Sequence, residues 1–256
     1  MFSIPSLGTI IYLILGGIVA GILSSAASFA SLASYPLLLS VGVAPLYANV
    51  TNDAALIWNS LGAVLASLKE LHGHWRTVMY YGALTVAGSV MGCCLLLSFS
   101  GKVFERVIPF FILFAGIMIV VSGRHQPSVG QSKSQWQKLL YGILLVVVGM
   151  YAGYFGAASG IVILVLLTYL TDENFLVVNA IKNAVCGLTN LVALLIYAFT
   201  SKIYWLDAIP MAIGMFIGGY LGPIVVRHVP VKVMRWIIAI LAVTQSMIYF
   251  KQAYFK

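Results

Sequence analysis

Long apolar stretches alternate with short polar gaps along the whole chain. In the first half, five mostly apolar stretches cover approximately 7–25, 29–42, 47–68, 77–99 and 103–122. After a polar interval, five more follow at approximately 139–155, 157–171, 175–199, 206–226 and 232–250. Because about 20 apolar residues in a row form a helix that can cross a bilayer, this pattern predicts an all-α, polytopic integral membrane protein.

The longest hydrophilic stretch, 123–138, contains Gly, Pro and Ser and predicts a loop. It divides the chain into a first transmembrane repeat at 1–122 and a second at 139–256. Each predicted repeat has about four to five transmembrane segments.

Identical residues recur in the two halves in the same order, which supports a duplication. Their offset drifts only from 132 to 130 residues, and the matches are Ala20-Gly21 with Ala152-Gly153, Ala26-Ala27-Ser28 with Ala157-Ala158-Ser159, Asn52 with Asn183, Asn59 with Asn190, Trp75 with Trp205, Gly88 with Gly218 and Gly92 with Gly222. Such an ordered series is hard to produce by chance, so we predict two homologous repeats.

In each half, small and hydroxyl residues separate the first two segments, as SSAASFAS at 24–31 and GYFGAASG at 153–160. The second segment spans only about 14 residues, which is short for a bilayer crossing. Non-helical backbone at membrane depth is tolerated only inside protein or beside a water-filled cavity. We therefore predict that the first segments of each repeat are broken or re-entrant and border a transporter binding site. Close helix packing through small residues is the alternative, and it is compatible with such a site.

Two corresponding segments carry polar side chains at spacings of 3, 4 and 7, which place them on one helix face. These residues are Asn49, Asn52, Asp53 and Asn59 in the third segment and Asn179, Lys182, Asn183 and Asn190 in the eighth. An Asn amide is neutral and offers two donors, so it can bind an oxyanion without trapping it. Interhelical hydrogen bonding is the alternative role. Their equivalence between the halves favours a shared central site.

Asp53 and Lys182 are the acid and the base that lie well inside apolar segments. A charge at such depth costs about 2.5–3.5 kcal/mol on insertion scales, so each is a candidate functional residue. The counterpart of Lys182 is Thr51 and that of Asp53 is Ala184, so the two charges are positioned to pair if their helices meet at the symmetry axis. We expect Lys182 to attract an anion while Asp53 tunes it or exchanges a proton. A structural ion pair is the alternative.

Composition excludes a water-soluble globular fold. Apolar residues make up 62% of the chain and charged residues 8%, against about 25% charged in soluble domains. The net charge of +8 comes from basic residues scattered singly, which argues against nucleic acid as a partner and suits positions beside membrane segments.

Several chemical motifs are missing. The chain has no GxxxxGK[ST] and no HExxH sequence, and His72 and His74 have no third metal ligand nearby in the sequence. The three cysteines form neither a disulfide framework nor a metal pair. We therefore predict no catalytic residue, no metal ligand and no cofactor, and we do not expect an enzyme.

Orientation is the least constrained feature. Apart from Lys182, the 13 Lys and Arg residues divide eight to five whether the halves are inverted or parallel. No basic residue precedes Lys69, which favours an external N-terminus and, with a cytoplasmic central loop, inverted halves. The C-terminal lysines argue for parallel halves. We expect inverted halves, each with its first two segments as a hairpin, and we expect the first segment to remain in the mature protein.

An ordered set of short motifs covers nearly the whole chain. The first half has Gly21-Ile-Leu-Ser-Ser25, Ser28, Pro36, Ala48-Asn-Val-Thr-Asn52, His74-Trp75-Arg76, Gly88 and Gly92; the second has Gly153-Tyr-Phe-Gly156, Ala180-Ile-Lys-Asn183, Tyr204-Trp205, Gly218-Gly219 and Gly222. This order resembles the sulfite exporter TauE/SafE family, also called the 4-toluene sulfonate uptake permease family. The first Gly-rich stretch of that family is largely Ser and Ala here.

The resemblance implies a secondary transporter in the cytoplasmic membrane that moves small sulfur-containing anions such as sulfite or organosulfonates. Alternating access is expected, with a proton or sodium as a possible coupling ion and the lipid bilayer as surroundings. An anion channel or a non-transporting membrane scaffold is the alternative, and repeat-related broken segments favour alternating access over a simple pore. The expected substrate-binding residues are Asn49, Asn52, Asp53, Asn59, Asn179, Lys182, Asn183, Asn190, Ser24, Ser25, Ser28 and Ser159.

Overall fold

A computed structural model describes residues 5–28, 30–98, 135–156, 159–171 and 173–228, and the single positions 106, 110, 113, 240, 243, 244, 247, 250 and 251. The regular structure within these residues is entirely helical. The helices are α1 (Leu7–Ala27), α2 (Ala30–Ser40), α3 (Pro45–Ala66), α4 (Leu68–Leu71), α5 (Trp75–Ser98), α7 (Gln135–Tyr154), α8 (Ser159–Thr171), α9 (Phe175–Thr200) and α10 (Trp205–Val226).

Eight of the predicted segments correspond to these helices, with ends that agree to within four residues. The largest difference is at α7, which begins at Gln135, so the last residues of the predicted loop are helical. The rest of that loop and nearly all of the predicted segments at 103–122 and 232–250 lie outside the described residues.

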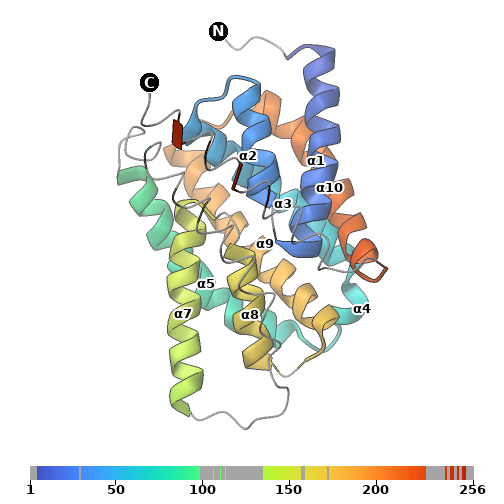
Figure 1. Cartoon of the computed structure of the whole chain (residues 1–256). Helices are drawn as coiled ribbons and strands as arrows, with labels where there is room; N and C mark the ends of the chain where they lie inside the picture. Colours follow the sequence, from blue (N-terminus) through green and yellow to red (C-terminus); the bar gives the residue numbers. More distant parts are fainter. Residues whose placement is uncertain are drawn as a thin grey trace.

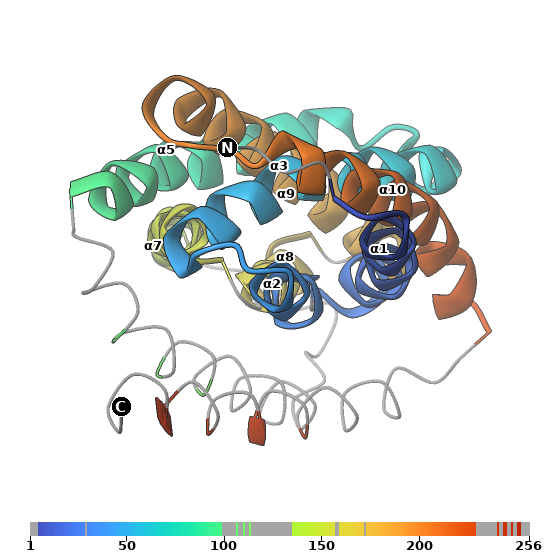
Figure 2. The ribbon, with the colours of Figure 1, turned by 90° about the horizontal axis from the view of Figure 1, so that it is seen from above.

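Two helical hairpins form the centre of the fold. At the open end of the α1–α2 hairpin, the hydroxyls of Tyr12 and Ser40 are hydrogen-bonded at 3.1 Å. At the open end of the α7–α8 hairpin, the rings of Tyr141 and Tyr169 stack with centroids 5.8 Å apart. In Figure 1, α1 begins at the top and α7 at the bottom, and Figure 2 shows both helices end-on. The two hairpins therefore run in opposite directions.

Each hairpin turns at a residue in the left-handed region of backbone conformation. These residues are Ser28, with φ of 66°, and Gly156, with φ of 73°. Glycine adopts this conformation without strain, whereas a residue with a Cβ atom loses about 1–2 kcal/mol there. The two turns meet in the interior, because a Cβ atom on Gly160 of α8 would lie 2.8 Å from the Cβ atom of Ser28.

Glycines allow the hairpins to pack closely against two long helices. A Cβ atom on Gly88 of α5 would overlap the carbonyl of Val146 in α7, and one on Gly149 of α7 would overlap the carbonyl of Thr85 in α5. Small residues at such crossings let helix backbones approach in the membrane, where hydrophobic force between helices is absent. The crossing of α1 with α10 uses Gly17, Gly21, Gly214 and Gly218 in the same way.

The surface is apolar and much of the interior is polar, as expected for a protein surrounded by lipid. On α1, for example, Leu7, Ile11 and Leu15 are 74%, 50% and 58% exposed, whereas Asn52 in α3 is fully buried. Large exposed apolar faces of this kind mark contact with a membrane. Four described helices are long and apolar enough to cross it, namely Leu7–Ala26, Trp75–Ser98, Phe175–Thr200 and Trp205–Val226.

We predict that Gly88→Ala lowers the melting temperature of the purified protein in detergent, whereas Gly142→Ala does not. The first variant forces α5 and α7 apart and should cost about 1–3 kcal/mol through overpacking. The second also lies between these helices, but its new Cβ atom would meet only Leu84, at an ordinary 3.7 Å. Equal melting temperatures for the two variants would contradict the close crossing.

Candidate functional site

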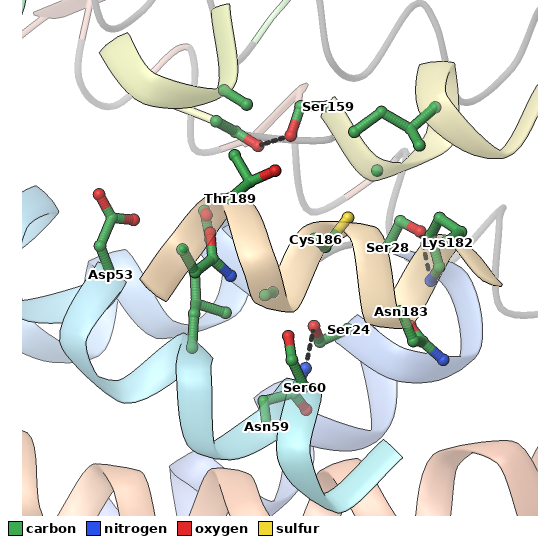
Figure 3. Close-up of a pocket in the computed structure, with 18 residues that line it drawn as sticks. Ser24, Ser28, Asp53, Asn59, Ser60, Ser159, Lys182, Asn183, Cys186 and Thr189 are labelled. Carbon is green, nitrogen blue, oxygen red and sulfur yellow. Dashed lines mark hydrogen bonds between the residues drawn. The ribbon is translucent and has the colours of Figure 1, made fainter. Parts of the chain in front are cut away.

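A cavity of about 60 Å³ lies where the two hairpin turns meet α3 and α9. Because one water molecule needs only ~10–15 Å³ of such volume, the cavity has room for a small ion or several waters. Its lining comes from α1, α2, α3, α7, α8 and α9. Figure 3 shows the lining side chains, most of which are polar or small.

Eight of the twelve predicted site residues line this cavity: Ser24, Ser28, Asp53, Asn59, Ser159, Lys182, Asn183 and Asn190. The other four are buried next to it without lining it: Ser25, Asn49, Asn52 and Asn179. The structure thus brings most of the polar stripes of α3 and α9 to one place.

Lys182 is 1% exposed, and its ammonium group is bound by neutral oxygens. It donates to the hydroxyl of Ser28 at 2.9 Å and to the carbonyl of Ser25 at 3.5 Å. Within the described part of the chain, no carboxylate forms an ion pair with it. A lysine has three donors, so one N–H and an uncompensated positive charge remain beside the cavity.

The carbonyl of Ser25, near the end of α1, is the acceptor for several side chains of α9. The amides of Asn179 and Asn183 donate to it at 3.1 and 3.2 Å, in addition to Lys182. The last carbonyls of a helix have no intrahelical partner and form the negative end of its dipole. These α9 side chains therefore hold the broken end of α1 in place.

The end of α7 is held in a comparable way by residues from α3 and α9. The amide of Asn49 donates to the carbonyl of Tyr154 at 3.4 Å. The hydroxyl of Tyr197 donates to the carbonyl of Gly153 at 2.6 Å. Both broken helix ends are thus capped by side chains from outside their own hairpin.

Other polar residues of α3 tie it to the first hairpin. Asn52 accepts from the hydroxyl of Ser34 at 2.5 Å and donates to that of Ser31 at 3.3 Å. Asn59 donates to the hydroxyl of Ser24 at 2.6 Å. Asn49, Asn52 and Asn179 lie outside the cavity lining and form interhelical hydrogen bonds. For these three residues, the alternative role that the sequence allowed is the one observed.

Asp53 and Lys182 do not form the ion pair that their neighbouring repeat positions allowed. Both line the cavity, but Figure 3 shows them on opposite sides of it. The side chain of Lys182 is directed to Ser28 at the turn of the first hairpin. Asp53 is 6% exposed, and within the described residues it has neither a hydrogen bond nor an ion pair.

Several lining residues were not among the predicted ones, notably Ser60, Cys186 and Thr189. The spacing contained a signal for two of them, because Cys186 and Thr189 follow Lys182 by four and seven residues and share its helix face. No group of three or more His, Cys, Asp or Glu side chains is arranged for metal binding in the described part of the chain.

Comparison with known proteins identifies relatives over nearly the full length. The profile of the family described as "Sulfite exporter TauE/SafE" matches residues 13–247. "Probable membrane transporter protein YfcA" of Escherichia coli strain K12 is 24% identical over 232 residues, which cover 89% of this chain and 84% of the relative. "Probable membrane transporter protein" of Haemophilus influenzae is 25% identical over 238 residues, which cover 91% and 92%. No solved structure gives a significant match.

We predict that Ser28→Gly is more stable than Ser28→Ala by about 1 kcal/mol, measured by thermal unfolding in detergent. Both variants remove the hydroxyl that accepts from Lys182, so they differ mainly in how well they tolerate a positive φ. At Ser159, the predicted repeat counterpart of Ser28, the backbone is helical. There we expect Ser159→Ala to be more stable than Ser159→Gly, because Ala has a higher helix propensity than Gly. Equal stability of the two Ser28 variants would show that the turn is unstrained.

Proposed function

Because the chain belongs to the sulfite exporter TauE/SafE family, we propose that it carries small sulfur-containing anions across the cytoplasmic membrane by alternating access. The family is one of membrane transporters rather than a class of enzymes, and the relatives bear the transporter name. Substrate class and mechanism are proposed from the site and from the arrangement of the hairpins.

The observation that carries the proposal is the buried, unpaired charge of Lys182. A buried cation is normally accompanied by an acid, because an isolated charge in an apolar interior is costly. Here the direct partners are the hydroxyl of Ser28 and the carbonyl of Ser25. A bound anion would supply the missing negative charge and accept the remaining N–H of the ammonium group.

The size and lining of the cavity favour a small oxyanion. Its volume of about 60 Å³ suits sulfite or a similarly small anion better than a bulky aromatic sulfonate. The hydroxyl of Ser60 and the amide of Asn190 also line it, and these groups can donate to the oxygens of an oxyanion. Neutral donors of this kind hold an anion without making its release slow.

The two hairpins support alternating access through two inverted repeats. They run in opposite directions (Figure 1), and the turn residues Ser28 and Gly156 both line the cavity. Asn49 and Asn179 are 130 residues apart, and each donates to the broken end of the other half's first helix. Discontinuous helices at corresponding places in inverted repeats are the usual surroundings of a transporter site.

The proposal is tested by counterflow in proteoliposomes. Vesicles loaded with unlabelled sulfite or thiosulfate should accumulate the same radiolabelled anion, because a carrier exchanges one for the other. An anion channel gives no such overshoot, and a scaffold protein gives no flux above protein-free vesicles. A thermal-shift screen with sulfite, thiosulfate, sulfate, taurine and sulfoacetate tests binding separately, since a ligand of the folded state raises the melting temperature.

We predict that Lys182→Met abolishes counterflow and weakens anion binding by roughly 10- to 150-fold, which corresponds to about 1.5–3 kcal/mol for a charged hydrogen bond. Lys182→Arg should be intermediate, because it keeps the charge with a different shape. Lys202→Met is the matched control, since Lys202 lies outside the cavity beside the ring of Tyr204. A folded Lys182→Met protein with unchanged counterflow would refute the anion site.

A further inference from the structure

The carboxylate of Asp53 is an unused acidic group in the cavity. It is 6% exposed and lines the cavity from α3. The neighbouring amides of α3 have partners, as Asn52 is bonded to Ser31 and Ser34, but Asp53 has none in the described part of the chain. An ionised carboxylate that is removed from bulk water and has no protein donor is disfavoured, so a ligand that neutralises this group would be favoured there.

Lys182 is not the neutralising group, because it lies across the cavity and donates to Ser28 (Figure 3). A metal cation is also a poor candidate, since it would need several oxygen ligands around the carboxylate, and no second carboxylate of the described residues lines the cavity. A proton needs only the carboxylate itself. It converts the group to a neutral acid that can still donate a hydrogen bond.

Few titratable groups surround Asp53. Within the described residues, the cavity lining contributes only Lys182 and Cys186 besides Asp53, and both are on α9. Outside the lining, Cys93 of α5 and Tyr197 of α9 are close enough for the charge of Asp53 to act on them. The lining residues from α1, α2, α7 and α8 are serines, glycines and apolar residues, and α10 contributes none. The acid of α4, Glu70, is paired with Arg227.

Protonation of Asp53 is linked to anion binding by electrostatics. An anion beside Lys182 shares the cavity with Asp53, so an ionised Asp53 repels it and a protonated Asp53 does not. Linkage is reciprocal, so a bound anion favours the protonated form to the same extent. When the carrier holds both the anion and the proton, the anion balances the charge of Lys182 and the proton neutralises Asp53. Both charges in the cavity are then compensated.

We propose that Asp53 is the proton-binding site of a proton–anion symport, in which the anion binds at the Lys182 end of the same cavity. The inference rests on the proposed function, because it assigns a coupling ion to that carrier. It assigns separate tasks to the two charged residues. Lys182 selects the anion, and Asp53 makes its affinity depend on a proton.

The test uses the full-length protein in proteoliposomes that contain the pH dye pyranine, with radiolabelled thiosulfate as the first probe and sulfite as the second. Thiosulfate stays fully ionised near neutral pH, so its own protonation does not imitate coupling. For wild type we expect an inward thiosulfate gradient to acidify the lumen and an inward proton gradient to drive accumulation at least several-fold. Counterflow without a pH gradient should become slower as the pH rises.

In Asp53→Asn, we expect lumen acidification and proton-driven accumulation to be lost. Its counterflow should be independent of pH, at the rate that wild type reaches in acid. Asp207→Asn is the matched control, because Asp207 lies in the first turn of α10 outside the cavity, and it should behave as wild type. Cys186→Ser removes the thiol of the lining, and a pH dependence that is lost in this variant but kept in Asp53→Asn would overturn the role of Asp53.

The outcomes separate the coupling from the carrier function. Absence of counterflow in wild type with either anion would overturn the proposed function and the coupling together. Wild-type counterflow with proton-driven accumulation that persists in Asp53→Asn would overturn the role of Asp53 alone and assign the pH dependence to Lys182 or another group. Accumulation that requires sodium and ignores the pH gradient would replace the proton by a metal cation.

Discussion

The structure depends on one constraint, which is that helix ends buried away from water must have their backbone carbonyls hydrogen-bonded. The breaks in the first segments place the ends of α1 and α7 inside the protein. In an apolar interior each unsatisfied carbonyl costs several kcal/mol. The chain meets this requirement with side chains from α3 and α9, which donate to Ser25, Gly153 and Tyr154.

The cavity follows from the same constraint. Two hairpins that point toward each other, with their ends capped from the sides, leave a small space between the turns. Close glycine crossings hold α1 against α10 and α7 against α5, and short Asn side chains of α3 and α9 reach the carbonyls at the ends of α1 and α7. Because the caps need donors, polar groups gather around this space. The candidate site and the structural support therefore use the same helix faces.

Sequence alone predicted the helices well, because membrane segments show strong contrast between apolar and polar residues. The breaks were also predictable, since small and hydroxyl residues interrupt both first segments. The sequence did not reveal which polar residues of α3 and α9 cap a helix end and which line the cavity. Spacing fixes which face of α3 carries Asn49, Asn52 and Asn59, but it does not reveal which position lies opposite a helix end and which lies opposite a void. That depends on where the partner hairpin stops.

The missing ion pair has a similar origin. The repeat alignment pairs Lys182 with Thr51, which lies only two residues before Asp53. It therefore suggested that Asp53 and Lys182 would form an ion pair. The two residues do not pair, because the side chain of Lys182 is directed to the turn at Ser28 and is long enough to reach it. The alignment also paired Ser28 with Ser159, yet Ser28 ends one hairpin helix while Ser159 begins one. Residues that a repeat alignment pairs need not have equivalent contacts.

The two charged residues of the cavity are not matched between the predicted repeats. Thr51, the counterpart of Lys182, accepts from the backbone N–H of Tyr204 at 3.2 Å and does not line the cavity. Ala184, the counterpart of Asp53, lies beside an apolar groove between α3, α5 and α9. If the charges were repeated in both halves, two lysines or two aspartates would lie in one small cavity, where like charges repel. One lysine from one half and one aspartate from the other avoid this repulsion and place opposite charges at two ends of the cavity.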